Sequence, residues 1–240
     1  MKAKRKGEMR ETPVNPTHIE ERILSIKQRI ADAAARAGRK AEDVKLVAVA
    51  KNRSVGEINE VLTSGVRDIG ENRVQEFLPK YDAIGGRAIW HFVGTLQRNK
   101  VSKIVGKVAL IHSVDSLKLA QEVGKRAEAL GVEQEVLLEV NVSGEASKRG
   151  FEPEGVKSQI GHLCSIRGIV VRGLMTVAPL VDNAEEVRPV FAELARLKDD
   201  LDGMGFEMPH LSMGMTNDFE VAIEEGATIV RIGTAIFAGR

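Results

Sequence analysis

The sequence predicts an α/β protein folded as one (β/α)8 TIM-type barrel. From Val44 onward, short apolar runs alternate with segments whose apolar residues recur at helical spacing. Strands interleaved with helices indicate a parallel sheet, and eight of them are typical of a closed barrel. The eight runs are Val44–Ala50, Arg67–Glu71, Ala88–Val93, Val108–Val114, Glu135–Val142, Val171–Val177, His210–Met213 and Thr228–Ile232.

A doubly wound open sheet is the alternative architecture. It predicts a Gly-x-Gly-x-x-Gly motif or a phosphate-binding lysine loop near its first strand. The chain has no such motif, and its Gly-Lys pairs at Gly106 and Gly124 lack the Ser or Thr that should follow. The five histidines are scattered, without a His-x-x-x-His pair or a cysteine partner, so no metal site is predicted.

Residues 1–16 are expected to form a mobile basic arm, and residues 17–240 the barrel domain. The arm is rich in Lys and Arg, has no apolar periodicity and ends at Pro16. Thr17, with Glu20 three residues later, has the pattern of a helix N-cap, and isoleucines at helical spacing continue that helix to Gly38. Because only residues 233–240 follow the last strand, this N-terminal helix is expected to cover that side of the barrel.

Composition excludes several classes of protein. The chain has 240 residues, 43% of them hydrophobic and 29% charged, with a net charge of +1. With charges this nearly balanced, no strong electrostatic attraction to nucleic acid or to a membrane surface is expected. Cys164 is the single cysteine, so an internal disulfide is excluded. Neither a secretory signal nor an 18-residue apolar span is present, and a cytoplasmic location is expected.

Strand parity predicts which side chains face the inside of the barrel, because residues two apart share a face. In the fifth strand a polar row alternates with an unbroken apolar row, and the polar row should point inward. The inward rows are then Val47, Val49 and Lys51; Leu137, Glu139 and Asn141; and Ile229, Arg231 and Gly233. A lysine, a glutamate, an asparagine and an arginine are therefore expected near one mouth.

Lys51 ends the first strand, at the end of a barrel where ligands bind. A lysine held there beside apolar neighbours can lose its proton and attack an aldehyde, whereas a solvated strand tip is the alternative. Arg231 needs either an internal salt bridge to Glu139 or a contact with a ligand. Glycine-rich loops at residues 212–217 and 233–235 follow the seventh and eighth strands, and barrels commonly bind phosphate with these two loops.

A Schiff-base lysine and a phosphate cup together fit pyridoxal 5′-phosphate, which carries an aldehyde and a phosphate. An aldolase acting on a phosphorylated sugar would share both features but would leave Arg231 without a clear task.

Asn217, with Glu220 three residues later, is expected to cap a helix that ends at Gly226.

Six motif blocks carry a family resemblance. The most specific are the Trp-His-Phe…Gln-x-Asn-Lys block and the Ser-Met-Gly-Met block. The six blocks are residues 47–51, 70–76, 90–100, 172–176, 211–215 and 230–237. With them, the chain resembles the pyridoxal phosphate homeostasis proteins, the YggS/PROSC family, from about Thr17 to its end.

This resemblance implies a fold similar to the barrel domain of alanine racemase and a cofactor held as an internal aldimine. It also implies a protein that buffers or delivers the cofactor rather than turning over a substrate. The chain departs from the family at Thr216, where a serine often follows Ser-Met-Gly-Met, but the hydroxyl is kept. Carried over by motif, the cofactor-binding residues are Lys51 as the aldimine lysine, Asn72 near the ring, Arg231 facing the pyridine nitrogen, and Ser212, Gly214, Gly233 and Thr234 around the phosphate.

A homeostasis module and a racemase-like enzyme remain the two main functional hypotheses. Racemisation needs bases on both faces of the substrate, and Tyr81, the only tyrosine, is expected to be an exposed helix residue. His91 and Lys148 are either acid/base groups or simply hydrogen-bonded and solvated, respectively. The expected partners are the cofactor itself and apo forms of pyridoxal-phosphate enzymes as recipients, with the protein a monomer or weak homodimer.

Overall fold

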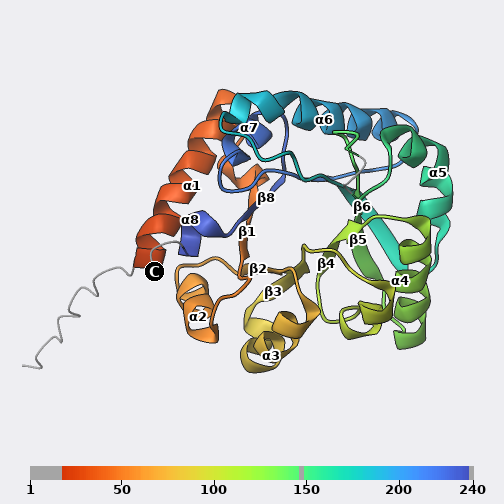
Figure 1. Ribbon diagram of the computed structural model, residues 1–240, viewed down its shortest axis with the longest axis horizontal. Helices are drawn as coiled ribbons and strands as arrows, with labels where there is room; N and C mark the ends of the chain where they lie inside the picture. Colours follow the sequence, from red (N-terminus) through yellow and green to blue (C-terminus); the bar gives the residue numbers. More distant parts are fainter. Residues whose placement is uncertain (1–17, 146–148, 238–240) are drawn as a thin grey trace, which may run out of the picture.

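The computed structural model describes residues 18–145 and 149–237 and contains a closed barrel of eight parallel strands (Figure 1). The strands follow one another in chain order, and β1 pairs with β8 to close the sheet. Each predicted run overlaps one strand, which confirms the predicted (β/α)8 barrel. The strands are β1 (Lys45–Val49), β2 (Asp68–Glu71), β3 (Ile89–Phe92), β4 (Leu110–Val114), β5 (Gln134–Glu139), β6 (Ile169–Met175), β7 (His210–Ser212) and β8 (Ile229–Ile232).

Helices surround the outer face of this sheet (Figure 1). After β3 the connection is the 3-10 segment η3 (Arg98–Lys103) rather than an α-helix. Among the described residues, none of the helices combines the length and the apolar character of a membrane-spanning segment. The α-helices are α1 (His18–Arg36), α2 (Val55–Thr63), α3 (Val74–Ile84), α4 (Leu117–Leu130), α5 (Pro153–Ser165), α6 (Arg188–Gly203), α7 (Phe219–Glu224) and α8 (Thr234–Phe237), and the other 3-10 segments are η1 (Ala41–Asp43), η2 (Gly85–Arg87) and η4 (Ala184–Val187).

Helix α1 covers the side of the barrel where the chain comes to its end, as predicted. Its isoleucines, from Ile19 to Ile30, are buried, so the predicted apolar face is confirmed. Within residues 233–237, the part of the chain described after β8, the single-turn helix α8 forms, and α1 runs beside α7 and α8 (Figure 1). The proposed cap Thr17 and the arm at residues 1–16 lie outside the described residues.

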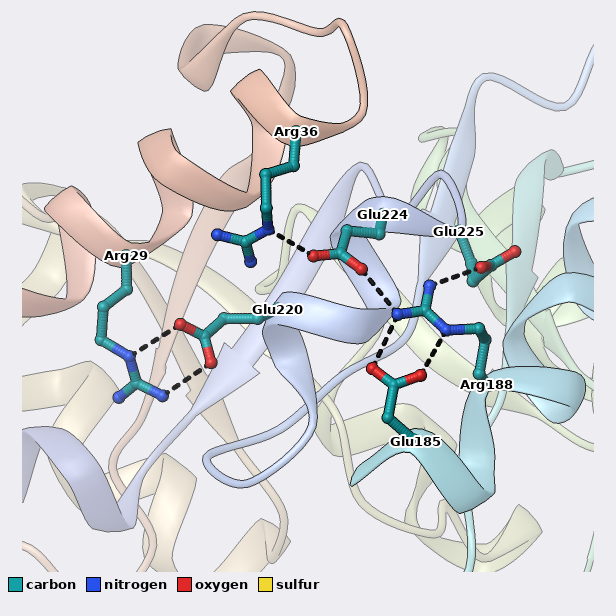
Figure 2. A network of polar contacts seen from close by, with 7 residues as sticks. All are labelled: Arg29, Arg36, Glu185, Arg188, Glu220, Glu224 and Glu225. Carbon is teal, nitrogen blue, oxygen red and sulfur yellow. Dashed lines mark hydrogen bonds and ion pairs between the residues drawn. The ribbon is translucent and has the colours of Figure 1, made fainter. Parts of the chain in front are cut away.

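A network of ion pairs joins α1, α7 and α6 (Figure 2). Arg29 on α1 makes two hydrogen bonds of 3.1 Å to Glu220 on α7. Glu224 bridges Arg36 of α1, at 2.7 Å, and Arg188 of α6, at 2.6 Å. Hydrogen bonds from both arginines lower the pKa of Glu224. The network ties the N-terminal helix to the short helix that follows the β7 loop.

The two faces of the sheet carry the residues that strand parity predicts. Ala48, Val136, Leu138, Val230 and Ile232 all belong to the large core cluster between the sheet and the helices. A separate small cluster fills the barrel interior with Val47, Leu110, Leu137, Met175 and Ile229. The predicted orientation of β1, β5 and β8 is therefore confirmed for the apolar positions.

Candidate functional site

A cavity of about 480 Å³ opens at the carboxyl ends of the strands, in the position where barrel proteins bind ligands. It is lined by residues on β1 and β8 and by residues that follow β1, β2, β3, β6, β7 and β8, far apart in the sequence. Five of the seven predicted site residues line it, namely Lys51, Asn72, Arg231, Gly233 and Thr234. The structure thus brings the Lys51 amine, the arginine and the last glycine-rich loop together around one space.

Lys51 lies in the turn that leaves β1, and its side chain is exposed at the cavity. Asn52, the next residue, has a φ of 58°, in the left-handed region that L residues seldom adopt. Ser54 then caps α2 through a capping box with Glu57, whose carboxylate accepts from the Ser54 N–H at 2.8 Å. The turn is short, and α2 begins four residues after Lys51.

A buried ion pair supports this turn from the outer side of the sheet. Lys80 on α3 donates to the Glu71 carboxylate at 2.6 Å and to the Ala50 carbonyl at 2.7 Å. Glu76 accepts from the backbone N–H of Asn52 at 2.6 Å. Burial raises the pKa of Glu71, although the neighbouring ammonium opposes that shift. Lys80 and Glu76 therefore hold the backbone on either side of Lys51, and sequence reasoning missed both contacts.

Asn72 follows β2 and lines the cavity with a side-chain oxygen that has no hydrogen-bond partner within the described structure. Gly94 packs directly against it, since a Cβ on Gly94 would lie 2.6 Å from the Asn72 Cα. Only glycine permits this approach. A buried amide oxygen without a partner is costly, so Asn72 is suited to receive a ligand N–H or O–H.

Arg231 is buried at the base of the cavity and is held from two strands. Its Nη1 donates to the carbonyl and the hydroxyl of Ser212, at 2.7 and 2.6 Å, and its Nη2 donates to the Thr176 carbonyl at 2.8 Å. These three bonds leave two of its five N–H donors for a ligand. Burial lowers the pKa of Arg231 to about 10, so the group keeps its charge at neutral pH.

The alternative salt bridge between Arg231 and Glu139 does not form among the described residues. Glu139 is half-buried and acts on the guanidinium only through its longer-range charge. Asn141 does not reach the cavity either, because β5 ends at Glu139 and parity no longer applies beyond it. Asn141 lines a different hollow and donates to the Glu145 carbonyl at 2.9 Å. Two of the four polar residues expected at the mouth are therefore elsewhere.

The loops after β7 and β8 meet at one side of the cavity. Thr216 and Asn217 of the first loop line it together with Gly233 and Thr234 of the second. The Thr216 hydroxyl accepts from the Ala235 N–H at 3.3 Å, which joins the two loops. These side chains and backbone groups offer the donors that a phosphate needs.

Helix α7 begins at Phe219, so the expected cap at Asn217 is misplaced. Asp218 precedes the helix, and its carboxylate accepts from the Met215 N–H at 2.5 Å. This bond closes the loop ahead of the helix and leaves Asn217 exposed at the cavity. Gly226 follows the helix with a φ of 100°, as the predicted stop requires.

Ser212 and Gly214 do not line the cavity. Ser212 is buried in β7, where its hydroxyl bonds Arg231 and the imidazole of His112. Gly214 has a φ of 89°, and a Cβ there would lie 2.8 Å from the Cα of Phe219. Both residues lie one layer beneath the predicted phosphate cup, Ser212 under Arg231 and Gly214 against α7.

Residues after β6 complete the cavity and were not predicted. The segment from Val177 to Val181 lines it, and Leu180 is 90% exposed. The signal for this rim was an apolar run, Val177-Ala178-Pro179-Leu180-Val181, that continues past the end of a strand.

Three further predicted candidates have different outcomes. Tyr81 is half-buried rather than exposed, because its ring packs 5.3 Å from that of Phe77 and 6.4 Å from that of Trp90. His91 is hydrogen-bonded inside the barrel, to Asp68 and His112. Lys148 lies outside the described residues.

Comparison with known proteins identifies the family. The family model for the alanine racemase N-terminal domain matches residues 23–240. The pyridoxal phosphate homeostasis protein of Aquifex aeolicus is 48% identical over 92% of this chain and 97% of its own length. Its counterpart from Pseudomonas aeruginosa is 40% identical over 92% of this chain and 96% of its own.

A solved structure agrees with this assignment. PipY of Synechococcus elongatus, with pyridoxal phosphate bound, has a TM-score of 0.80 at 32% identity and covers 92% of this chain and 100% of its own. The fold, the coverage of both chains and the degree of identity point the same way, and the chain belongs to the pyridoxal phosphate homeostasis protein family.

Proposed function

We propose that the protein binds pyridoxal 5′-phosphate in the cavity at the carboxyl ends of the strands and serves cofactor homeostasis and delivery, with little or no turnover. The observation that carries the proposal is the placement of the Lys51 amine and of the β7 and β8 loops around one cavity of about 480 Å³. A PipY structure holds this cofactor, and the relatives at 40–48% identity are homeostasis proteins by name.

The residues present fit the cofactor. When bound, it supplies an aldehyde that a lysine amine can attack, an aromatic ring and a phosphate. Lys51 would hold it covalently, while the hydroxyls of Thr216 and Thr234 and the backbone at Gly233 would bind its phosphate. Arg231 would direct its free N–H groups at the ring nitrogen. The unpartnered oxygen of Asn72 would gain a polar neighbour.

The ionisable groups around the cavity suit a carrier better than a racemase. Among the described residues that line it, only Lys51, Asp218 and Arg231 ionise. Arg231 keeps its proton at neutral pH, so it donates to a ring nitrogen without protonating it and leaves the ring a weak electron sink. Asp218 is buried and accepts the Met215 N–H. Neither residue supplies the pair of opposed bases that racemisation needs.

Borohydride reduction followed by peptide mapping tests the binding proposal. We expect the cofactor adduct on Lys51, with no adduct in Lys51→Ala. Lys100→Ala is the matched control, since Lys100 lines the neighbouring hollow and should not affect labelling. A label mainly on Lys100 or Lys148, with Lys51→Ala still yellow, would overturn the assignment. A colourless wild-type protein that instead reacts with phosphorylated sugars would favour the aldolase.

Proton exchange tests the absence of turnover. The protein is incubated with L- and D-amino acids in deuterated water while NMR follows the α-proton. A missing acid/base group typically costs a factor of about 10²–10⁴, so exchange should be far slower than in a dedicated racemase. Transfer of the cofactor to an apo-enzyme should be observable. Rapid catalytic exchange that disappears in Lys51→Ala would favour the racemase-like enzyme.

A further inference from the structure

Five polar side chains form a continuous string across the inside of the barrel, from the amino end of β2 to Arg231. Asp68 Oδ1 lies 2.9 Å from His91 Nε2, and His91 Nδ1 lies 3.0 Å from His112 Nε2. His112 Nδ1 lies 2.8 Å from the Ser212 Oγ, which accepts from Arg231 Nη1 at 2.6 Å. This polar string runs through β2, β3, β4, β7 and β8 and links the two ends of the barrel.

The string is closed to solvent except at one end. His91, His112 and Ser212 are at most 1% exposed. The Asp68 side chain is 19% exposed and lies 3.4 Å from the Lys45 ammonium, at the amino ends of the strands. Arg231 is 5% exposed and borders the cavity at the other end. The string is therefore partly open to solvent at Asp68, and its opposite end borders the ligand cavity.

Chemistry at the two ends sets the direction of every hydrogen bond between them. The Arg231 guanidinium can only donate and an ionised Asp68 can only accept, so His91 carries a proton on Nε2. Neutral His91 then accepts at Nδ1 from His112 Nε2–H. Neutral His112 in turn accepts the Ser212 hydroxyl proton at Nδ1. All bonds point from Arg231 toward Asp68, and no donor or acceptor along the string is left unmatched.

We propose that the polar string is a proton-ordered relay, in which protonation of His91 at the Asp68 end reverses the hydrogen bonds and changes how Ser212 holds Arg231. Its effect on the cofactor rests on the proposed function, because Arg231 is the member that borders the cavity. Asp68, His91, His112 and Ser212 are positioning residues in this relay, since none of them touches the cavity.

The added proton can be followed along the string. His91 gains its second proton at Nδ1 from His112 Nε2, and the proton added to the string is bound at His112 Nδ1, so the string gains one proton in total. The Ser212 oxygen then accepts from both His112 and Arg231, and its hydroxyl proton loses its acceptor. One proton gained by the string thus alters the contact to Arg231, without any movement of the backbone.

Burial and nearby charges disfavour a second proton on His112. The groups that face it are Lys45 from β1, Asp68 from β2, His210 from β7 and Arg231 from β8. Burial, and then the charges of His91 and Arg231, hold the pKa of His112 well below its usual range. Burial would raise the pKa of Asp68, but the His91 hydrogen bond and Lys45 lower it, so the carboxylate stays ionised beside His91.

Nitrogen-15 NMR of the imidazoles in the apo-protein tests the relay without any cofactor. Signals are assigned with His91→Gln and His112→Gln. At neutral pH we expect both rings to carry the proton on Nε2 alone. As pH falls, His112 should change from the Nε2–H form to the Nδ1–H form as its Nε2 proton passes to His91. A His112 ring already protonated on Nδ1 at neutral pH, or one that stays on Nε2 after His91 is charged, would overturn the proposal.

The coupling to Arg231 is tested in the holoprotein by the pH dependence of the cofactor's visible absorbance. Asp68→Asn should shift the midpoint, whereas the exposed control Asp82→Asn on α3 should not. Ser212→Ala cuts the string, so adding Asp68→Asn to it should cause no further shift. Equal shifts in both backgrounds, or no shift in either, would contradict the coupling. Failure of the wild type to bind cofactor would instead refute the proposed function and leave the NMR result standing.

Discussion

The two faces of the barrel sheet bury different chemistry. The outer face packs against the helices in one continuous apolar cluster that runs from Ile19 on α1 to Phe237 on α8. The inner face contributes only five residues to an apolar cluster of its own, and the rest of the interior holds His91, His112, Ser212 and Arg231. The outer layer stabilises the barrel, while the inner layer places polar groups beneath the cavity.

This contrast separates residues that stabilise the fold from residues that serve the site. Burying apolar area contributes about 25 cal/mol per Å², which favours the outer layer as the main source of stability. A buried guanidinium is costly without hydrogen bonds, and Arg231 accordingly donates to Ser212 on β7 and to the Thr176 carbonyl just after β6, which leaves two N–H donors toward the cavity. Among the described residues, the charged exception in the outer layer is the buried Glu71–Lys80 pair, and it lies where the layer supports the Lys51 turn.

The largest effect is expected from a cavity in the outer layer. Phe77 on α3 is fully buried, with its ring 5.5 Å from that of Trp90 in an edge-to-face arrangement. Phe77→Ala should lower the free energy of unfolding by about 3–5 kcal/mol, measured by urea denaturation. Cofactor affinity, measured where the variant is folded, should change little. The free energy of unfolding of the exposed control Leu24→Ala should stay within about 0.5 kcal/mol of wild type. A large loss of cofactor affinity in Phe77→Ala would show that the outer layer also serves the site.

Lys80→Met tests the buried Glu71–Lys80 ion pair. It leaves the Glu71 carboxylate buried without its cation, which should cost about 3 kcal/mol at neutral pH. Burial already raises the folded-state pKa of Glu71, and loss of Lys80 should raise it further. A carboxyl whose pKa is higher in the folded state loses stability as pH rises above its unfolded value of about 4.3. The penalty should therefore shrink between pH 7.5 and pH 4.5.

The matched control is the double variant Lys80→Met with Glu71→Gln. It removes the uncompensated charge, so it should recover part of the stability and lose the added pH dependence. A penalty for Lys80→Met that is equal at both pH values would show that the pair does not act through the charge of Glu71.

The difference between the apolar outer face and the partly polar inner face also explains which parts of the fold and the site the sequence predicts. Apolar periodicity is a local signal, so the eight strands and the buried face of α1 could be predicted, and parity placed Lys51 and Arg231 correctly. The polar string depends on contacts between distant strands, such as the bond from His112 to Ser212, 100 residues apart. Its members are also single polar residues in apolar runs, which periodicity cannot pair with one another.

The wrong placements of Ser212 and Asn141 both follow from where a strand ends. β7 is only three residues long, so the Ser-Met-Gly-Met motif turns from the barrel interior to the cavity within a few residues. Ser212 therefore lies beneath Arg231, and Thr216 borders the cavity. Asn141 was misplaced because the apolar alternation continues past Glu139, where the strand ends.

A smaller effect is expected at the cavity rim, where Thr234→Ala removes one hydroxyl. Loss of a hydrogen bond to a charged group should cost about 1.5–3 kcal/mol, or about one to two decades in cofactor affinity. Titration with the phosphorylated and the unphosphorylated aldehyde separates the phosphate contact from others. Thr95→Ala, in the neighbouring hollow, is the control. An equal loss for both aldehydes would mean that Thr234 does not contact the phosphate.

The smallest effect is expected from deletion of residues 1–16. Helix α1 begins at His18 with its own buried face, and Arg29 fixes it to α7 through Glu220 and by lying 4.6 Å over the Phe219 ring. The deletion should therefore leave cofactor affinity unchanged and stability within about 0.5 kcal/mol, measured by titration and thermal melting. Arg29→Ala sets the scale, because a half-exposed ion pair and a cation–π contact are together worth about 1 kcal/mol. A deletion that costs more stability than Arg29→Ala, or that weakens cofactor binding, would show that residues 1–16 contribute to the barrel or to its mouth.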